Sequence, residues 1–95
     1  MTTCELRKKA AEVIETRGWH RGSYIGQNGA VCMLGALHIA AFGNAVGCDL
    51  TNSLEARIAF NEAKESIGLK SIPKWNDRKG RTKNQVIERL LKGCE

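Results

Sequence analysis

Proline, aromatic residues and long apolar runs are all scarce in this chain of 95 residues. It has a single proline and only 5% aromatic residues, yet 42% of its residues are hydrophobic, which excludes a disordered chain and indicates a globular one. The longest apolar stretch, residues 31–46, is interrupted by Gly35, His38 and Gly43. It is too short for a membrane-spanning helix, which needs roughly 20 apolar residues. We therefore expect one domain, residues 1–95, with no membrane as a partner.

Several familiar site motifs are missing as well. The four cysteines include no C-x-x-C pair, and there is no G-x-G-x-x-G or Walker A pattern. We therefore expect neither a metal nor a cofactor. The first residues lack the basic-then-apolar layout of a secretory signal, and the cysteines are too sparse for a secreted disulfide scaffold. These absences predict a cytoplasmic protein whose cysteines are reduced thiols, most of them buried.

Most of the chain shows helical periodicity, because apolar residues recur every three to four positions over most of its length. Capping patterns and glycines mark the ends of the helices. The predicted helices cover residues 3–17 after Thr2, residues 33–42, a third helix capped by Thr51, Asn52 or Ser53 and ending near residue 67, and a last helix after Thr82. The helix at 33–42 is apolar almost all round, as a central buried helix would be.

The segment between the first two helices, residues 23–32, is predicted to form a small antiparallel β-hairpin. Asn28-Gly29 is the favoured dipeptide for a tight two-residue turn. Further along, Ile72-Pro73 predicts extended backbone. The expected fold class is therefore α+β and mainly helical, with about four helices packed around the central apolar helix and one hairpin.

Cys32 is the first candidate catalytic residue. It lies where the hairpin meets the apolar helix, and the N–H groups of a helix N-terminus lower the pKa of a thiol. A nucleophile would also need a base, either His20 or His38. Asp77 or Asn76 would have to orient that base. The apolar run around the cysteine favours the alternative of a buried structural residue.

The basic residues near the start of the last helix are the second candidate. Residues 69–95 carry eight bases and three acids, a surplus equal to the whole net charge of +5. Helix N-termini bind phosphate through their free N–H groups, and Trp75 can stack on a base. The structural alternative places Trp75 in the core and Asn76-Asp77 in an Asx-type turn. The converging basic residues are Arg78, Lys79, Arg81 and Lys83.

The order GW…G.Y….G..C.LGAL, followed by WND…RT..V, resembles an uncharacterised family of short actinobacterial and phage proteins. The likeness covers most of the chain, from the first helix to the last. It implies a shared fold and a phage or bacterial source, but no activity. Within the pattern, the combination to inspect for a shared pocket is Tyr24, Cys32, Asn76 and Asp77.

The short chain and its incomplete catalytic groups favour a small non-enzymatic module that binds a macromolecular partner. We expect a protein partner, with nucleic acid or phosphate bound by residues 78–83 as one alternative. The other alternative is an enzyme with Cys32 as nucleophile and Asp77 in support. The candidate binding residues are Tyr24, Trp75, Asn76, Arg78, Lys79, Arg81 and Lys83.

Overall fold

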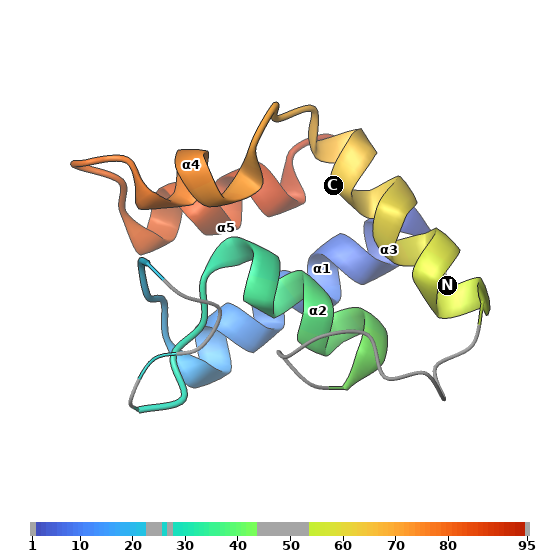
Figure 1. Ribbon diagram of the computed structural model, residues 1–95, viewed down its shortest axis with the longest axis horizontal. Helices are drawn as coiled ribbons and strands as arrows, with labels where there is room; N and C mark the ends of the chain where they lie inside the picture. Colours follow the sequence, from blue (N-terminus) through green and yellow to red (C-terminus); the bar gives the residue numbers. More distant parts are fainter. Residues whose placement is uncertain (1, 23–25, 27, 44–53, 95) are drawn as a thin grey trace.

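The computed structural model describes residues 2–22, 26, 28–43 and 54–94. They form five helices (Figure 1): α1 (Thr3–Arg17), α2 (Met33–Phe42), α3 (Leu54–Ile67), α4 (Ile72–Asp77) and α5 (Lys83–Leu91). The predicted bounds of the first two helices are confirmed, as are the end of the third and the start of the last. The caps predicted for the third helix lie outside the described residues. None of the helices in the described ranges is long and apolar enough to cross a membrane.

Side-chain caps set where the helices begin. Thr2 Oγ1 accepts the backbone N–H of Glu5 at 3.1 Å ahead of α1. Ahead of α5, Thr82 and Gln85 form a reciprocal capping box with bonds of 3.1 and 3.2 Å. Each cap satisfies N–H groups that have no acceptor inside the helix. Gly18 ends α1 with a φ of 93°, a conformation that other residues avoid.

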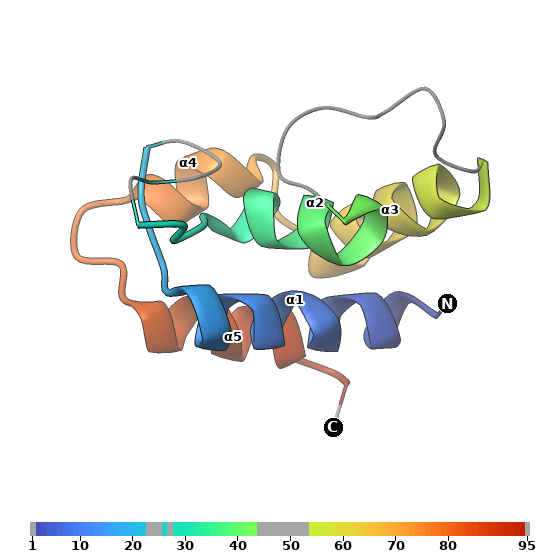
Figure 2. The same ribbon diagram turned by 90° about the horizontal axis from the view of Figure 1, so that it is seen from below.

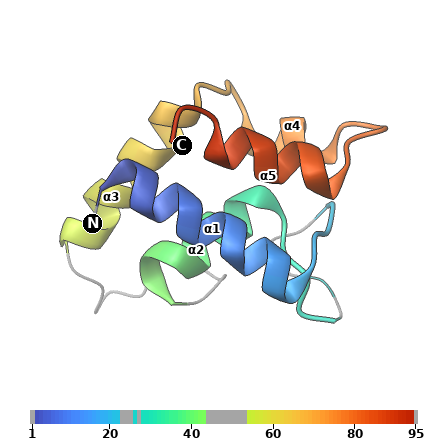
Figure 3. The same ribbon diagram turned by 180° about the vertical axis from the view of Figure 1, so that it is seen from behind.

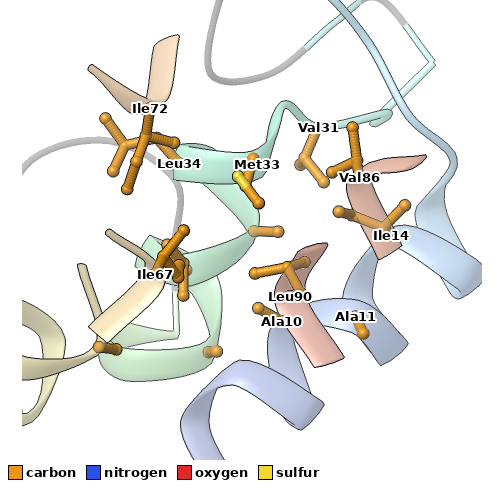
Figure 4. Close-up of a cluster of buried hydrophobic side chains, with 14 of the residues drawn as sticks. Ala10, Ala11, Ile14, Val31, Met33, Leu34, Ile67, Ile72, Val86 and Leu90 are labelled. Carbon is orange, nitrogen blue, oxygen red and sulfur yellow. The ribbon is translucent and has the colours of Figure 1, made fainter. Parts of the chain in front are cut away.

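The helices pack in two layers. α1 and α5 lie side by side in one layer, and α2, α3 and α4 form the other (Figures 2 and 3). α2 contacts α1, α3 and α4, and it is buried from Met33 to His38, so the prediction of a central apolar helix is confirmed. Figure 4 shows that all five helices contribute to the core, with Ala10, Ile14, Met33, Ile67, Ile72, Val86 and Leu90 among its members.

His38 is a buried polar residue on α2. It is 7% exposed, and its ring centroid lies 4.5 Å from that of Phe60 and 5.5 Å from that of Phe42. Burial lowers the pKa of His38 from its ordinary value of 6.5, and the positive charge of Lys64 lowers it further. The folded protein therefore favours the neutral imidazole.

We expect the free energy of unfolding to decrease as the pH is lowered from about 7.5 to about 5, because the unfolded chain binds a proton on His38 that the folded protein resists. This contribution is complete above the unfolded pKa of about 6.5 and is lost below it, by at most about 1.4 kcal/mol per pH unit. Urea unfolding over this range measures the slope. The slope should be shallower in His38→Phe, and an unchanged slope would contradict the assignment to His38.

The predicted β-hairpin at residues 23–32 is wrong, and so is the α+β class, because no β-strand occurs in the described ranges. Residues 23–25 and 27 of that prediction lie outside them. What the structure does contain is an isolated parallel bridge between Trp19 and Val31, with backbone bonds of 2.9 and 3.0 Å. Both backbone groups of Val31 are used in this bridge, so Val31 pairs with the connection after α1 and not across the turn at Asn28-Gly29.

The extended segment predicted at Ile72-Pro73 is also wrong, since these residues open α4. Ser71 Oγ accepts the N–H of Lys74 at 3.3 Å, and the proline lies in the first turn, where a helix needs no N–H. The bias against helix before a proline is outweighed by this cap and by the burial of Ile72. Asn76 consequently lies in a helix and not in an Asx-type turn.

Two of the cysteines predicted to be reduced form a disulfide instead. Cys4, in α1, is bonded to Cys94, after α5, with Cα atoms 5.4 Å apart. Cys32 is a free, buried thiol, as expected, and Cys48 lies outside the described residues. The pairing was missed because the two residues are separated by 90 positions, and only the packing of α1 against α5 brings them together.

Arg7 ties the same two helices one turn further along α1. Its side chain is 6% exposed, and its guanidinium donates to the carbonyl groups of Arg89, Leu90 and Lys92 at 3.0, 2.9 and 2.8 Å. Carbonyl groups at a helix C-terminus have no donor within the helix. Arg7 therefore caps α5 while the carbonyl groups satisfy its charged N–H groups.

Candidate functional site

Asn76 of α4 is a buried polar residue whose side chain connects several segments of the protein by hydrogen bonds. Its side chain is completely buried. Its Oδ1 accepts the indole N–H of Trp19 at 2.7 Å and the backbone N–H of Met33 at 3.0 Å. Its Nδ2 donates to the carbonyl of His20 at 3.2 Å and to Asp77 Oδ1 at 3.0 Å. Both donors and both acceptor positions of the amide are thus used, and α4 is joined to the start of α2 and to the connection after α1.

Asp77 extends this cluster to the surface. Its Oδ1 also accepts the backbone N–H of Gly22 at 2.9 Å. The hydrogen bonds from Asn76 and Gly22 lower the pKa of Asp77, and the nearby charges of Arg21 and His20 lower it further. A carboxylate that stays ionised in this way is poorly matched to proton transfer at neutral pH.

Cys32 caps α2, as its position in the sequence suggested. Its Sγ accepts the N–H of Gly35 at 3.3 Å, and the residue is 4% exposed. Burial raises the pKa of Cys32, and the charge of Asp77 raises it too, although the N–H groups of Gly35 and Leu34 act in the opposite direction. The two candidate catalytic residues both adjoin Asn76, which donates to Asp77 and accepts the N–H of Met33, the residue after Cys32. Neither the exposure nor the pKa of the thiol is that of an activated nucleophile.

We expect the thiol of Cys32 to react with iodoacetamide at about pH 7 at least 100-fold more slowly in the native protein than in the unfolded protein, because reaction requires local or global opening. Mass spectrometry of the Cys32-containing peptide over time measures the rate. The same protein in urea without reductant is the control. Fast alkylation of the native protein would contradict this prediction and support the enzyme alternative.

The predicted basic residues lie around the connection between α4 and α5, at one end of the molecule (Figure 1). Arg78 and Lys79 are exposed. Arg21, from the connection after α1, joins them by donating to the carbonyl of Arg78 at 3.2 Å. Two lysines of the flanking helices complete the group. We call this set of residues the basic end: Arg21, Lys74, Arg78, Lys79 and Lys83.

Arg81 is held differently from these side chains. Its Cζ lies 3.7 Å from the ring centroid of Trp75, and its Nε donates to the carbonyl of Trp75 at 2.9 Å. Trp75 is half-buried and packs against the core. A shallow groove of about 380 Å³ lies beside this pair, between α4 and α5. Its lining residues are Trp75, Arg81, Gln85, Glu88, Arg89 and Lys92.

The structure thus joins Asn76 to Asp77 and, through the N–H of Met33, to the residue after Cys32, while Arg21 and Arg78 of the basic end lie beside Asp77. Tyr24 lies outside the described residues. Sequence reasoning missed Trp19 as a partner of Asn76, and also the part of the groove formed by α5. The second omission had a signal, because positions 85, 88, 89 and 92 follow the spacing of one face of the predicted last helix. Within the described part of the chain, no three His, Cys, Asp or Glu side chains gather closely enough to hold a metal ion.

These features define a small helical protein in which the buried Asn76 makes all of its hydrogen bonds within the protein. Its basic end presents exposed positive charge at one end of the molecule. The chain belongs to a family of unknown function, DUF6197, which matches it over residues 1–93. This confirms the resemblance to an uncharacterised family. In comparisons with curated proteins and with solved structures, nothing matches the chain.

Proposed function

We propose that the protein is a non-enzymatic module that binds nucleic acid through its basic end. The observation that supports this most directly is the exposure of Arg78 and Lys79 beside Arg21. The C-terminal third of the chain carries the whole surplus of positive charge. Clustered exposed cations bind a phosphate backbone by displacing its counterions, and they need no pocket to do so.

The geometry around Cys32 supports a non-enzymatic function. The thiol is buried, its pKa is raised, and it serves as the cap of α2. The amide of Asn76 has no hydrogen-bonding capacity left for a substrate, since every position is used inside the protein. Cys32 and Asn76, which were candidates for a functional site in the sequence, therefore have structural roles that explain their presence.

The surroundings of the basic end favour nucleic acid over a protein partner. The centre of a protein interface is normally rich in exposed apolar and aromatic side chains. In the described residues, the large exposed hydrophobic side chains are Leu54 and Ile58, in the first turns of α3. Figure 1 shows that this part of α3 and the α4–α5 connection lie at opposite ends of the molecule. The basic end therefore presents positive charge without the exposed apolar side chains that the centre of a protein interface needs.

The test is fluorescence anisotropy with a labelled single-stranded oligonucleotide of about 12 nucleotides, in salt from about 50 to 300 mM. We expect log affinity to decrease linearly with log salt. In the variant R78A/K79A/K83A the affinity at low salt should fall at least tenfold. The salt slope should decrease by about 2, since each lost phosphate contact removes about 0.7 for a single strand.

The matched control is K8A/K9A/R57A, which removes the same charge from exposed positions of α1 and α3. It should keep most of the affinity, since these positions lie outside the basic end. If no binding occurs even at 50 mM salt, the proposed function is wrong and a protein partner becomes the better hypothesis. An equal loss in both variants would show that net charge alone attracts the oligonucleotide.

A further inference from the structure

Arg81, which stacks on Trp75, is a half-buried cation whose side chain is held in place near the basic end. Its guanidinium is fixed twice, by the ring face at 3.7 Å and by the carbonyl of Trp75 at 2.9 Å from Nε. Within the described residues Arg81 donates through Nε alone, which leaves its terminal N–H groups for water or a ligand. Such a guanidinium keeps its planar pair of donors in place without a ligand.

The groove beside this stack is rich in positive charge. Arg89 is anchored in a similar way, since its Nη2 donates to the carbonyl of Ile67 at 2.9 Å. Lys92 adds a third cation to the lining and Gln85 a neutral amide, against the single carboxylate of Glu88. Two of the three cations are thus held by backbone carbonyl groups, and the lining of the groove has a net positive charge.

We propose that this groove is a phosphate site for a nucleic acid strand, with Arg81 as the residue that receives the phosphate in a bidentate contact. The inference rests on the proposed function and adds a defined position to it. A planar guanidinium matches two phosphate oxygens, whereas a lysine offers a point charge. Because Arg81 is already ordered, little side-chain entropy is lost on binding.

The position of Arg81 in the chain connects the two surfaces. It lies between the exposed residues of the α4–α5 connection and the groove along α5. A strand held by Arg78 and Lys79 can therefore continue past Arg81 toward Arg89. In this arrangement the basic end supplies attraction that depends on salt, and the groove supplies a contact of defined geometry.

The test compares two substitutions that preserve charge, R81K and R57K, in the oligonucleotide assay. We expect R81K to lose about tenfold in affinity, because lysine forms neither the ring stack nor the bidentate contact. R57K should stay within about twofold of the wild type, because Arg57 is exposed on α3 and lies outside both the basic end and the groove. Equal affinities for the two variants would overturn the inference while leaving the proposed function intact.

Two further measurements do not depend on the folding of R81K. Glu88 is exposed, so E88Q should fold normally and, by removing the carboxylate from the groove, should raise the affinity about threefold. In the wild-type protein, the NMR signal of the Arg81 Nε–H should shift on addition of the oligonucleotide. An unchanged affinity in E88Q together with an unshifted Nε–H signal would show that the strand does not enter the groove. If R78A/K79A/K83A also binds like the wild type, the proposed function itself fails.

Discussion

Reduction of the Cys4–Cys94 disulfide will lower the free energy of unfolding by about 4 kcal/mol. The two cysteines are separated by 90 positions, and a crosslink over so long a segment restricts the unfolded chain strongly. A domain of this size has a total stability of only about 5–15 kcal/mol. The thermal midpoint should therefore drop by on the order of 20 °C.

Urea unfolding with and without dithiothreitol measures this effect. The C4S/C94S variant should unfold like the reduced wild type, and reductant should not change its midpoint. At low temperature its circular dichroism should match that of the oxidised protein, because the bonds from Arg7 to the end of α5 do not depend on the disulfide. A loss below about 1 kcal/mol on reduction would contradict the structural role assigned to the crosslink.

Asn76→Leu will lower the free energy of unfolding by about 4 kcal/mol, although leucine has the same branched arrangement of side-chain heavy atoms. The substitution leaves the indole N–H of Trp19, the N–H of Met33 and the carbonyl of His20 without their partner. Each buried polar group that loses its hydrogen bond costs about 1–3 kcal/mol. The start of α2 and the connection after α1 should both loosen, because both are held by this side chain.

Chemical unfolding measures the loss, and the fluorescence of Trp19 and Trp75 reports on the site. Asn61→Leu is the matched control, since Asn61 is exposed on α3 and its replacement should change stability by less than about 0.5 kcal/mol. If Asn76→Leu lowers the free energy of unfolding no more than this control does, the hydrogen bonds of Asn76 do not hold the fold together.

Local patterns predicted the long helices well. Thr2 and Thr82 cap the helices that they were expected to cap, and Gly18 ends α1 where the periodicity stops. These predictions succeed because a cap depends on atoms within about one turn of the chain. The basic connection was predicted for the same reason, since charge clustered along the chain stays clustered at a helix connection.

The predictions that failed involve competition between segments. The turn residues near Asn28 favoured a hairpin, but both backbone groups of Val31 bond to the connection after α1 instead. The residue before Pro73 favoured extended backbone, but Ser71 and the burial of Ile72 stabilised a helix. In each case a local preference of about 1 kcal/mol or less was outweighed by packing or capping.

Periodicity and capping, which act within a turn or two, were enough to establish a mainly helical protein with a buried central helix and a basic C-terminal third. Tertiary packing alone paired Cys4 with Cys94, enclosed Asn76 among donors from distant segments and laid Arg81 on Trp75 beside a groove. Except for the Arg81–Trp75 stack, these contacts join residues more than 40 positions apart. Their partners are chosen by which helix faces meet, and no pattern within one segment of the chain records that choice.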